Sequence, residues 1–154
     1  MVVVDKKDGI KCFCVDFRQL NKVNKPILHP LPVIDGMLSR LGKAQYFATL
    51  DLKSGYCQVL MDEEDKEKTA FACHRELFEF FVMPFGLLGA PPVFIELMNI
   101  VLGGLEDFAI PYLDNIIIFS ASPEEHLSRI RTVFDTLREH GLKMKLKKCS
   151  LFWN

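Results

Sequence analysis

The sequence lacks an apolar run of the roughly 18 residues that a transmembrane helix requires. It also begins without the ordered basic and apolar regions of a secretory signal peptide, so we expect a cytoplasmic or nuclear protein without a membrane partner. The five cysteines are odd in number, and no second pair accompanies Cys12 and Cys14 to complete a zinc site. We therefore expect reduced, mostly buried thiols.

The sequence also has little net charge, but its charges are segregated. The formal net charge of the 154 residues is −1. Residues 1–50 hold 8 basic and 4 acidic residues, residues 51–125 hold 4 and 14, and residues 126–154 hold 7 and 2. Basic ends around an acidic middle favour a metal-binding centre between phosphate-contacting surfaces, although the same charges could simply solvate the surface.

Two short apolar segments each end in a carboxylate. Residues 108–113 and 116–120 are β-prone and flank Asp114-Asn115, which predicts a β-hairpin with an acidic tip. An Asp at such a tip can serve as a turn former only. However, the apolar strand 46–50 also ends at a carboxylate, that of Asp51. Two carboxylates delivered to one sheet edge can hold divalent metals that drive phosphoryl transfer.

Four sequence blocks resemble one protein family. Tyr112-Leu113-Asp114-Asn115 is similar to the Tyr-x-Asp-Asp box of reverse transcriptases, with Asn115 in place of the last Asp. Three further blocks resemble the same family in the same order, at residues 15–21 (VDFRQLN), 50–56 (LDLKSGY) and 82–87 (VMPFGL). The similarity extends over essentially the whole chain and is greatest to the polymerase of gypsy-type LTR retrotransposons.

Hydrophobic periodicity and turn residues predict the elements of an α+β fold. We expect a hairpin of the strands 2–4 and 12–17 with its turn at residues 6–9, a second hairpin of 68–73 with 77–82, and further strands at 46–50, 56–61, 108–113 and 116–120. We also expect a basic strand from 143, a solvated acidic turn at 62–65, and helices at 33–41, 91–102 and 123–140. The last helix has a capping box that begins at Ser122, and its expected apolar face is Leu127, Ile130, Val133, Phe134 and Leu137.

The order of strands and helices from residue 46 predicts a ferredoxin-like polymerase palm, an antiparallel sheet with helices on one face, plus partial fingers. The expected division is 1–45 partial fingers, 46–61 palm with the first catalytic strand, 62–90 a fingers/palm hairpin, and 91–154 palm. Measured against the family, the chain stops before the primer-gripping strands and the thumb.

The resemblance implies RNA-directed DNA polymerisation, in which a deoxynucleotide is transferred to a primer 3′-hydroxyl with the help of two Mg²⁺ ions, or Mn²⁺. It implies that Asp51, Asp114 and the Leu52 backbone hold the metals, while Asn115 stands at the third carboxylate position. A neutral amide supplies no charge, and a unit charge about 4 Å from a cation contributes about 4 kcal/mol at an effective dielectric of 20.

The resemblance also implies contacts with the incoming nucleotide and with nucleic acid. An arginine that grips the triphosphate in the family is replaced by Cys12, which cannot donate a forked hydrogen bond. The nucleotide-binding candidates are Lys6 or Lys7, Tyr56, Phe85 and Gly86, and Tyr56 could equally be a core residue. The nucleic-acid candidates are Arg18, Tyr112, Leu113, Lys143 and Lys145. Arg18 could instead form an ion pair with Asp16, and the lysines could protect an edge strand.

Three functional hypotheses follow. The first is a retrotransposon-type reverse transcriptase segment that is impaired by Asn115, by Cys12 and by the absence of a thumb, with an RNA or DNA template-primer and deoxynucleoside triphosphates as partners. The second is a non-catalytic nucleic-acid or protein-binding module derived from such a polymerase. The third is a retroelement remnant without a present function.

Overall fold

The computed structural model describes residues 2–5, 11–25, 41–42, 44–74 and 76–153. The chain forms two compact units: residues 1–27 with 56–91, and residues 28–55 with 92–154. Within the described residues, no helix combines the length and the apolar character needed to cross a membrane.

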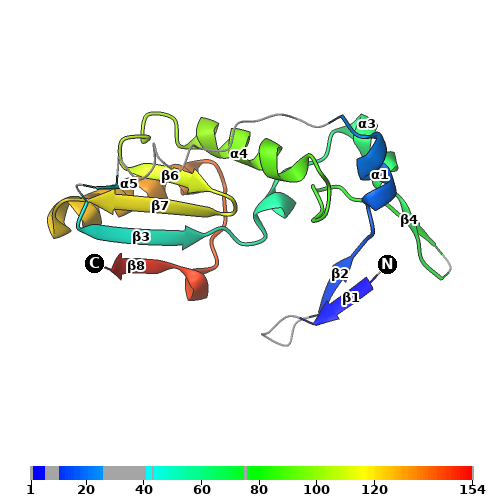
Figure 1. The fold of residues 1–154 in the computed structure, drawn as a ribbon, viewed down its shortest axis with the longest axis horizontal. Helices are drawn as coiled ribbons and strands as arrows, with labels where there is room; N and C mark the ends of the chain where they lie inside the picture. The colour runs from blue at the N-terminus through cyan, green and yellow to red at the C-terminus, as the bar shows by residue number, and fades with distance from the viewer. Residues whose placement is uncertain (1, 6–10, 26–40, 43, 75, 154) are drawn as a thin grey trace. The chain divides into compact units, whose positions relative to one another are not determined.

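The second unit contains a four-stranded antiparallel sheet with the strand order β6-β7-β3-β8 (Figure 1). Its elements follow in the order β3 (Tyr46–Asp51), α4 (Ala90–Val101), β6 (Ala109–Tyr112), β7 (Asn115–Ser120), α5 (Pro123–Glu139) and β8 (Ser150–Trp153). A βαββαβ order with the first strand between the third and the fourth is the ferredoxin-like arrangement. The predicted α+β palm is therefore confirmed.

One face of the central strands forms the core of this unit. Leu50 of β3 lies opposite Ile116 of β7, Ala48 lies opposite Ile118, and all four side chains are fully buried. Because side chains alternate along a strand, Asp51 and its partner Asn115 lie on the other face of the sheet.

Helix α5 begins at the predicted cap. The Ser122 Oγ accepts a hydrogen bond of 3.3 Å from the Glu125 N–H, and the Glu125 Oε2 accepts one of 2.9 Å from the Ala121 N–H. The predicted apolar face was wrong at its first residue, since Leu127 is 60% exposed whereas His126 is fully buried. The helix is rotated so that His126 faces the sheet.

Hydrogen bonds to two strands explain why His126 is buried. Its Nδ1 lies 2.8 Å from the Ser120 Oγ of β7, and its Nε2 lies 3.2 Å from the Leu151 carbonyl oxygen of β8. A carbonyl only accepts, so Nε2 donates and Nδ1 accepts from the Ser120 hydroxyl. The Phe152 ring packs edge-on against the imidazole. His126 thereby joins α5, β7 and β8.

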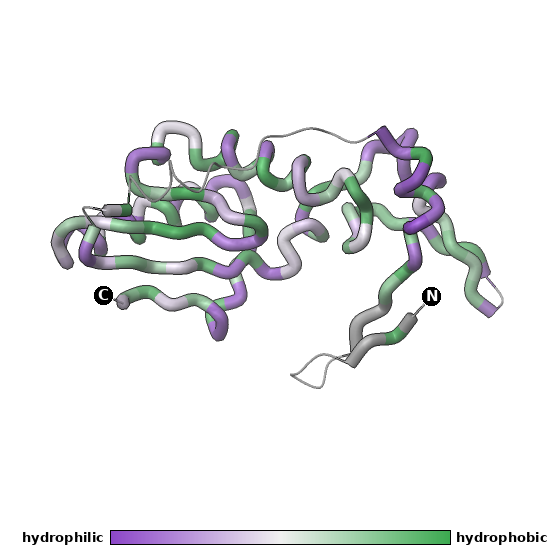
Figure 2. The backbone as a smooth tube through the Cα atoms, in the orientation of Figure 1, coloured by the Kyte–Doolittle hydropathy of each residue, from purple (hydrophilic) through white to green (hydrophobic). Residues whose placement is uncertain are grey.

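The segment before β8 differs from the predicted basic strand. Met144 forms one isolated bridge with Leu52, and residues 146–148 form a short 3-10 helix, η3 (Leu146–Lys148). Figure 2 shows hydrophilic residues at this turn. The strand begins only at Ser150. At its other end Trp153 stacks on Phe47 of β3, with ring centroids 4.9 Å apart. Packing against β3, rather than the alternation of lysines, decides where pairing begins.

The first unit begins with a hairpin of β1 (Val2–Asp5) and β2 (Lys11–Cys14), as predicted. The second strand is shorter than the expected 12–17, because the Asp16 carboxylate accepts a hydrogen bond of 3.0 Å from the Arg18 N–H where helix α1 (Arg18–Val23) begins. The predicted turn at residues 6–9 and the body of the predicted helix 33–41 lie outside the described residues.

The predicted strand 56–61 is wrong. Residues 55–58 form a 3-10 helix, η1 (Gly55–Gln58), and only Leu60 pairs further on, in an isolated bridge with Val82. Gly55 lies against the Phe94 ring, where an added Cβ would come within 2.8 Å of a ring carbon. This close packing favours the compact 3-10 turn over an extended strand.

The remainder of the first unit contains short elements only. They are α3 (Glu63–Lys66), η2 (Glu67–Thr69), β4 (Phe71–Ala72) and β5 (Leu77–Phe78), with β4 and β5 paired. The predicted hairpin is thus confirmed in its pairing but is shorter. The predicted acidic turn at 62–65 is exposed, and it is helical because the Asp62 side chain accepts the Glu64 N–H.

The cysteines are only partly as expected. Cys14, Cys57, Cys73 and Cys149 are reduced thiols, as predicted. However, Cys73 is exposed and the other three are half-buried, so the expectation of mostly buried thiols was wrong.

Candidate active site

The register of the palm sheet places two of the candidate residues directly opposite each other. Asp51 is the last residue of β3, Asn115 is the first residue of β7, and the two are paired. Directly opposed residues on one face of an antiparallel pair have Cβ atoms about 4.5–5.5 Å apart. The position that lacks the third carboxylate therefore faces Asp51 across the strand pair.

The third candidate residue lies in the turn between β6 and β7. The turn residues are Leu113 and Asp114, not the predicted Asp114 and Asn115, because Asn115 already pairs with Tyr112 in the strand ladder. Leu113 adopts a φ of +54°, a left-handed conformation that non-glycine residues rarely take. The Asp114 carbonyl accepts a hydrogen bond of 3.1 Å from the Leu52 N–H.

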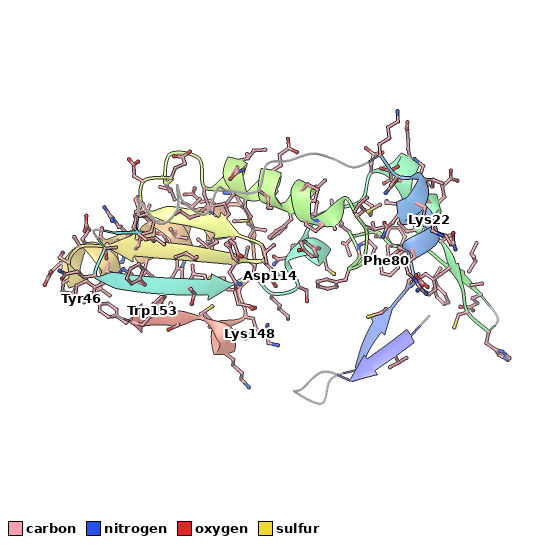
Figure 3. All side chains as sticks on the ribbon, in the orientation of Figure 1. Lys22, Tyr46, Phe80, Asp114, Lys148 and Trp153 are labelled. Atoms are coloured by element: carbon pink, nitrogen blue, oxygen red, sulfur yellow. The ribbon has the colours of Figure 1, made fainter. Side chains whose placement is uncertain are left out.

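Asp51, Leu52 and Asp114 are thus joined at one end of the sheet. The backbone bond between Leu52 and Asp114 continues the pairing of β3 with β7 beyond Asp51, so the Asp114 turn is held against the end of β3. Asp51 is buried, whereas Asp114 and Asn115 are half-buried. Figure 3 shows Asp114 at the end of the sheet opposite to Tyr46.

Three residues of the segment before β8 contact Asp51. The Lys148 Nζ donates a hydrogen bond of 3.0 Å to the Asp51 Oδ2 and forms an ion pair with it. The Asp51 N–H donates to the Cys149 Sγ at 3.3 Å, and the Asp51 carbonyl accepts from the Lys145 N–H at 2.8 Å. Sequence reasoning missed the roles of Lys148 and Cys149, because nothing local connects them to a residue almost a hundred positions earlier.

The donor set at this sheet end consists of oxygen atoms. The Asp51 and Asp114 carboxylates, the Leu52 carbonyl and the Asn115 amide oxygen are ligand types that Mg²⁺ and Mn²⁺ accept. Among the described residues, no group of three or more His, Cys, Asp or Glu side chains is arranged to hold a metal ion. The donors therefore fit a hard divalent cation in kind, but they supply one charge fewer than three carboxylates would.

The nucleotide-binding candidates that the structure describes lie in the first unit. Tyr56 in η1 is half-buried, and its ring meets the 42% exposed Phe85 ring at a centroid distance of 5.4 Å. Gly86 has a φ of +95°, which explains the glycine. Lys6 and Lys7 lie outside the described residues, as does the side chain of Cys12.

Asn21, which sequence reasoning did not single out, fixes the loop that carries Phe85 and Gly86. Its Nδ2 donates to the Gly86 carbonyl at 2.8 Å, and its Oδ1 accepts from the Leu88 N–H at 2.9 Å. An available signal was its place at the end of the block 15–21. The two hydrogen bonds hold the loop from both sides of Leu87.

The nucleic-acid candidates differ in their surroundings. Arg18 forms the alternative ion pair with Asp16 at 2.6 Å, from the start of α1 rather than from a strand, and its side chain is 86% exposed. The side-chain hydrogen bonds of Arg18, followed by its backbone hydrogen bond, lower the pKa of Asp16 to about 2. Tyr112 and Leu113 are 45% and 42% exposed beside the turn.

Lys143 and Lys145 do not lie on the predicted strand. They flank Met144, which bridges Leu52, and the Lys143 carbonyl accepts the Lys53 N–H at 2.9 Å. Lys143 is exposed and Lys145 is half-buried. Their backbones therefore support the end of β3, whatever their side chains contact.

Comparison with known proteins identifies the family. The family model described as "Reverse transcriptase (RNA-dependent DNA polymerase)" matches residues 4–154. The chain belongs to the reverse transcriptase family. A Retrovirus-related Pol polyprotein from transposon 297 of Drosophila melanogaster is 46% identical over 136 residues, which is 88% of this chain and 13% of that polyprotein. The Transposon Tf2-7 polyprotein of Schizosaccharomyces pombe is 37% identical over 150 residues, 97% of this chain and 11% of its own length.

Solved reverse transcriptases share the fold. The foamy viral protease-reverse transcriptase in complex with double-stranded DNA matches with a TM-score of 0.87 and 27% identity, over 98% of this chain and 26% of that one. The same type of enzyme in complex with an RNA/DNA hybrid matches with a TM-score of 0.83 and 26% identity, over 96% and 20% of the two chains. This reverse transcriptase segment spans about an eighth or less of the polyproteins it matches. Its relatives place it in the retrotransposon type.

Proposed function

We propose that this chain carries the nucleotidyl-transfer site of a retrotransposon RNA-directed DNA polymerase, in a form weakened at Asn115. The observation that carries the proposal is the register of β3 and β7, which brings Asp51 to one sheet end with Asn115 opposite and the Asp114 turn beside it. A strand and a neighbouring turn that deliver carboxylates to one point supply the negative field that metal-dependent phosphoryl transfer requires.

Asp51, Asp114 and the Leu52 carbonyl would hold the divalent ions, Mg²⁺ or Mn²⁺. When bound, such ions activate the primer hydroxyl and neutralise the charge that develops on the triphosphate. Asn115 would offer its amide oxygen without a charge. If about 4 kcal/mol of transition-state stabilisation is lost with the missing carboxylate, the rate falls on the order of a thousandfold.

The other candidate residues would position the substrates. Tyr56 and Phe85 are in contact and partly exposed, so their rings would pack against the incoming nucleotide, while Lys6 or Lys7 would pair with its phosphates. Tyr112, Leu113, Lys143, Lys145 and Arg18 would contact a template-primer. Solved relatives in complex with double-stranded DNA and with an RNA/DNA hybrid support this class of partner.

The experiment measures deoxynucleoside triphosphate binding to the chain with an RNA–DNA template-primer, with and without Mg²⁺. We expect Mg²⁺ to strengthen binding in the wild type, and we expect Asp51→Asn to abolish this strengthening. Gln19→Glu on the exposed face of α1 is a control that changes one charge elsewhere. A strengthening by Mg²⁺ that survives in Asp51→Asn would contradict the proposal.

A second function, a non-catalytic nucleic-acid-binding module, is favoured by one observation. The Asp51 carboxylate already forms an ion pair with Lys148, which reduces the negative field at this sheet end. Such a module would bind the template-primer in a manner that weakens with salt and is indifferent to Mg²⁺. Nucleotide binding measured with and without Mg²⁺ separates the two functions, since only the polymerase site should respond to Mg²⁺.

A further inference from the structure

The contact between Lys148 and Asp51 joins an exposed cation to a buried anion. The Asp51 side chain is 12% exposed, whereas the Lys148 side chain is 57% exposed, and Nζ lies 3.0 Å from Oδ2. A buried carboxylate is costly unless it is paired, because burial removes its hydration. Lys148 therefore supplies a positive charge that the Asp51 carboxylate needs in the folded chain.

The backbone builds this ion pair. The Asp51 carbonyl accepts the Lys145 N–H at 2.8 Å, and the Lys145 carbonyl accepts the Lys148 N–H at 2.8 Å, which closes η3. The Asp51 N–H then bonds the Cys149 Sγ at 3.3 Å. Both backbone groups of Asp51 are thus attached to the segment that carries Lys148. The ammonium is held beside the carboxylate by a chain of contacts, and the side chain retains an exposed path away from it.

The Asp51 and Asp114 carboxylates bring two negative charges to this sheet end, and the opposed Asn115 adds none. Lys53, Lys143 and Lys145 also lie there through their backbones, and Lys148 forms a direct ion pair with the Asp51 carboxylate. Figure 3 shows Lys148 and Asp114 at the same end of the sheet. A divalent cation that binds Asp51 must share this carboxylate with the ammonium or replace it, since like charges repel at such distances.

We propose that Lys148 is an internal competitor for divalent cations at Asp51, so that Lys148 sets the metal affinity of this palm. The inference rests on the metal-holding role of Asp51 in the proposed function. Its consequence is that the lysine lowers the affinity for Mg²⁺ and Mn²⁺ in addition to the effect of Asn115. Metal binding releases the Lys148 side chain from Asp51, and loss of the metal restores the ion pair.

The test measures Mn²⁺ binding to the full chain by electron paramagnetic resonance, which detects free Mn²⁺ without any reaction. Lys148→Met should bind Mn²⁺ up to about fivefold more tightly than the wild type, the size expected when a partly exposed ion pair no longer has to be broken. Lys147→Met is the matched control: it removes the same charge from the same turn, and Lys147 forms no ion pair with a described residue. It should change the affinity far less.

Further variants distinguish failure of the competition from failure of the metal site. Asp51→Asn combined with Lys148→Met should lose the gain in Mn²⁺ affinity that Lys148→Met shows alone, because the competition takes place at the Asp51 carboxylate. Equal affinities of the wild type and Lys148→Met, with binding lost in Asp51→Asn, would overturn the competition and leave the proposed metal site intact. Failure of every variant to bind Mn²⁺, Asn115→Asp included, would overturn both the competition and the proposed metal site. Far-UV circular dichroism checks that Lys148→Met folds, and Lys148→Gln provides a second neutral variant.

Discussion

Replacement of Asn115 by Asp tests the cross-strand geometry of the site without any assay of activity. The change places a carboxylate directly opposite Asp51 on the same face of the sheet. Directly opposed like charges destabilise a strand pair by about 0.2–1 kcal/mol. Lys148 offsets this repulsion only in part, because its side chain is 57% exposed and its charge is screened by solvent. We therefore expect the metal-free variant to be less stable than the wild type.

The size of the effect follows from the chain length. For a domain of 150 to 250 residues, 1 kcal/mol shifts the melting temperature by about 2–4 °C, so a loss of about 0.2–1 kcal/mol should lower it by about 0.4–4 °C. A divalent ion at a hundred times its dissociation constant stabilises the folded state by about 2.7 kcal/mol. The added carboxylate should make Asn115→Asp bind Mn²⁺ more tightly than the wild type does. Addition of Mn²⁺ should therefore reverse the order of the two proteins and leave Asn115→Asp the more stable.

Differential scanning calorimetry at several Mn²⁺ concentrations measures both parts of this prediction. Gln19→Glu, an amide-to-carboxylate change on the exposed face of α1, is the matched control, and Mn²⁺ should raise its melting temperature no more than that of the wild type. A metal-free Asn115→Asp as stable as the wild type, with both melting temperatures raised equally by Mn²⁺, would contradict this prediction. That result would mean that residue 115 does not share a charged site with Asp51.

Three other substitutions test separate features. Arg18→Met should raise the pKa of Asp16 from about 2 toward its ordinary 3.8 in an NMR titration, because the Arg18 hydrogen bonds lower this pKa. In the wild type the Asp16–Arg18 pair stabilises the chain above pH 3.8, and this contribution is lost as the pH falls toward 2. An unchanged pKa of Asp16 in Arg18→Met would contradict the assignment. His126→Leu should lower the free energy of unfolding in urea by about 1–3 kcal/mol, because the Leu151 carbonyl loses its hydrogen-bond donor. A decrease no larger than that caused by His74→Leu at an exposed position would contradict this role of His126. Leu113→Gly should stabilise the chain by up to about 1 kcal/mol, since glycine accepts the φ of +54°, and a destabilised variant would show that this φ is not strained.

The palm sheet could be predicted from the sequence because each of its central strands is a single apolar run. The exact turn could not. Leu113 continues the apolar run of β6, so the polar pair Asp114-Asn115 was the natural turn, but the pairing of Asn115 with both Tyr112 and Asp51 places the turn one residue earlier. As a result, Leu113 adopts a left-handed backbone conformation, which is unfavourable for leucine.

Contacts between distant residues explain the other differences. Periodicity assigned Leu127 to the core because it is apolar, whereas the hydrogen bonds of His126 to Ser120 and Leu151 turn that side of α5 inward. The apolar run after Tyr56 indicated a strand, but the packing of Gly55 against Phe94 favours a 3-10 turn. In each case the deciding partner is absent from the local sequence.

The site itself was predictable only in part. The motif resemblance identified Asp51, Asp114 and Asn115, and the structure brings the three to one sheet end. Lys148 is 97 residues from Asp51, and its lysine-rich surroundings gave no reason to choose it over Lys143 or Lys145. The hydrogen bonds that join Asp51 to Lys145 and Lys145 to Lys148 bring the Lys148 side chain to Asp51.

Primer extension on an RNA template with Mg²⁺ or Mn²⁺, by the wild type and by Asn115→Asp, tests the polymerase site most directly. We expect weak or no extension by the wild type and a gain on the order of a thousandfold in the variant, because the added carboxylate restores a charge beside the metals. Extension by Asn115→Asp that is no faster than that of the wild type would contradict the claim that this sheet end is a polymerase site weakened by one missing carboxylate.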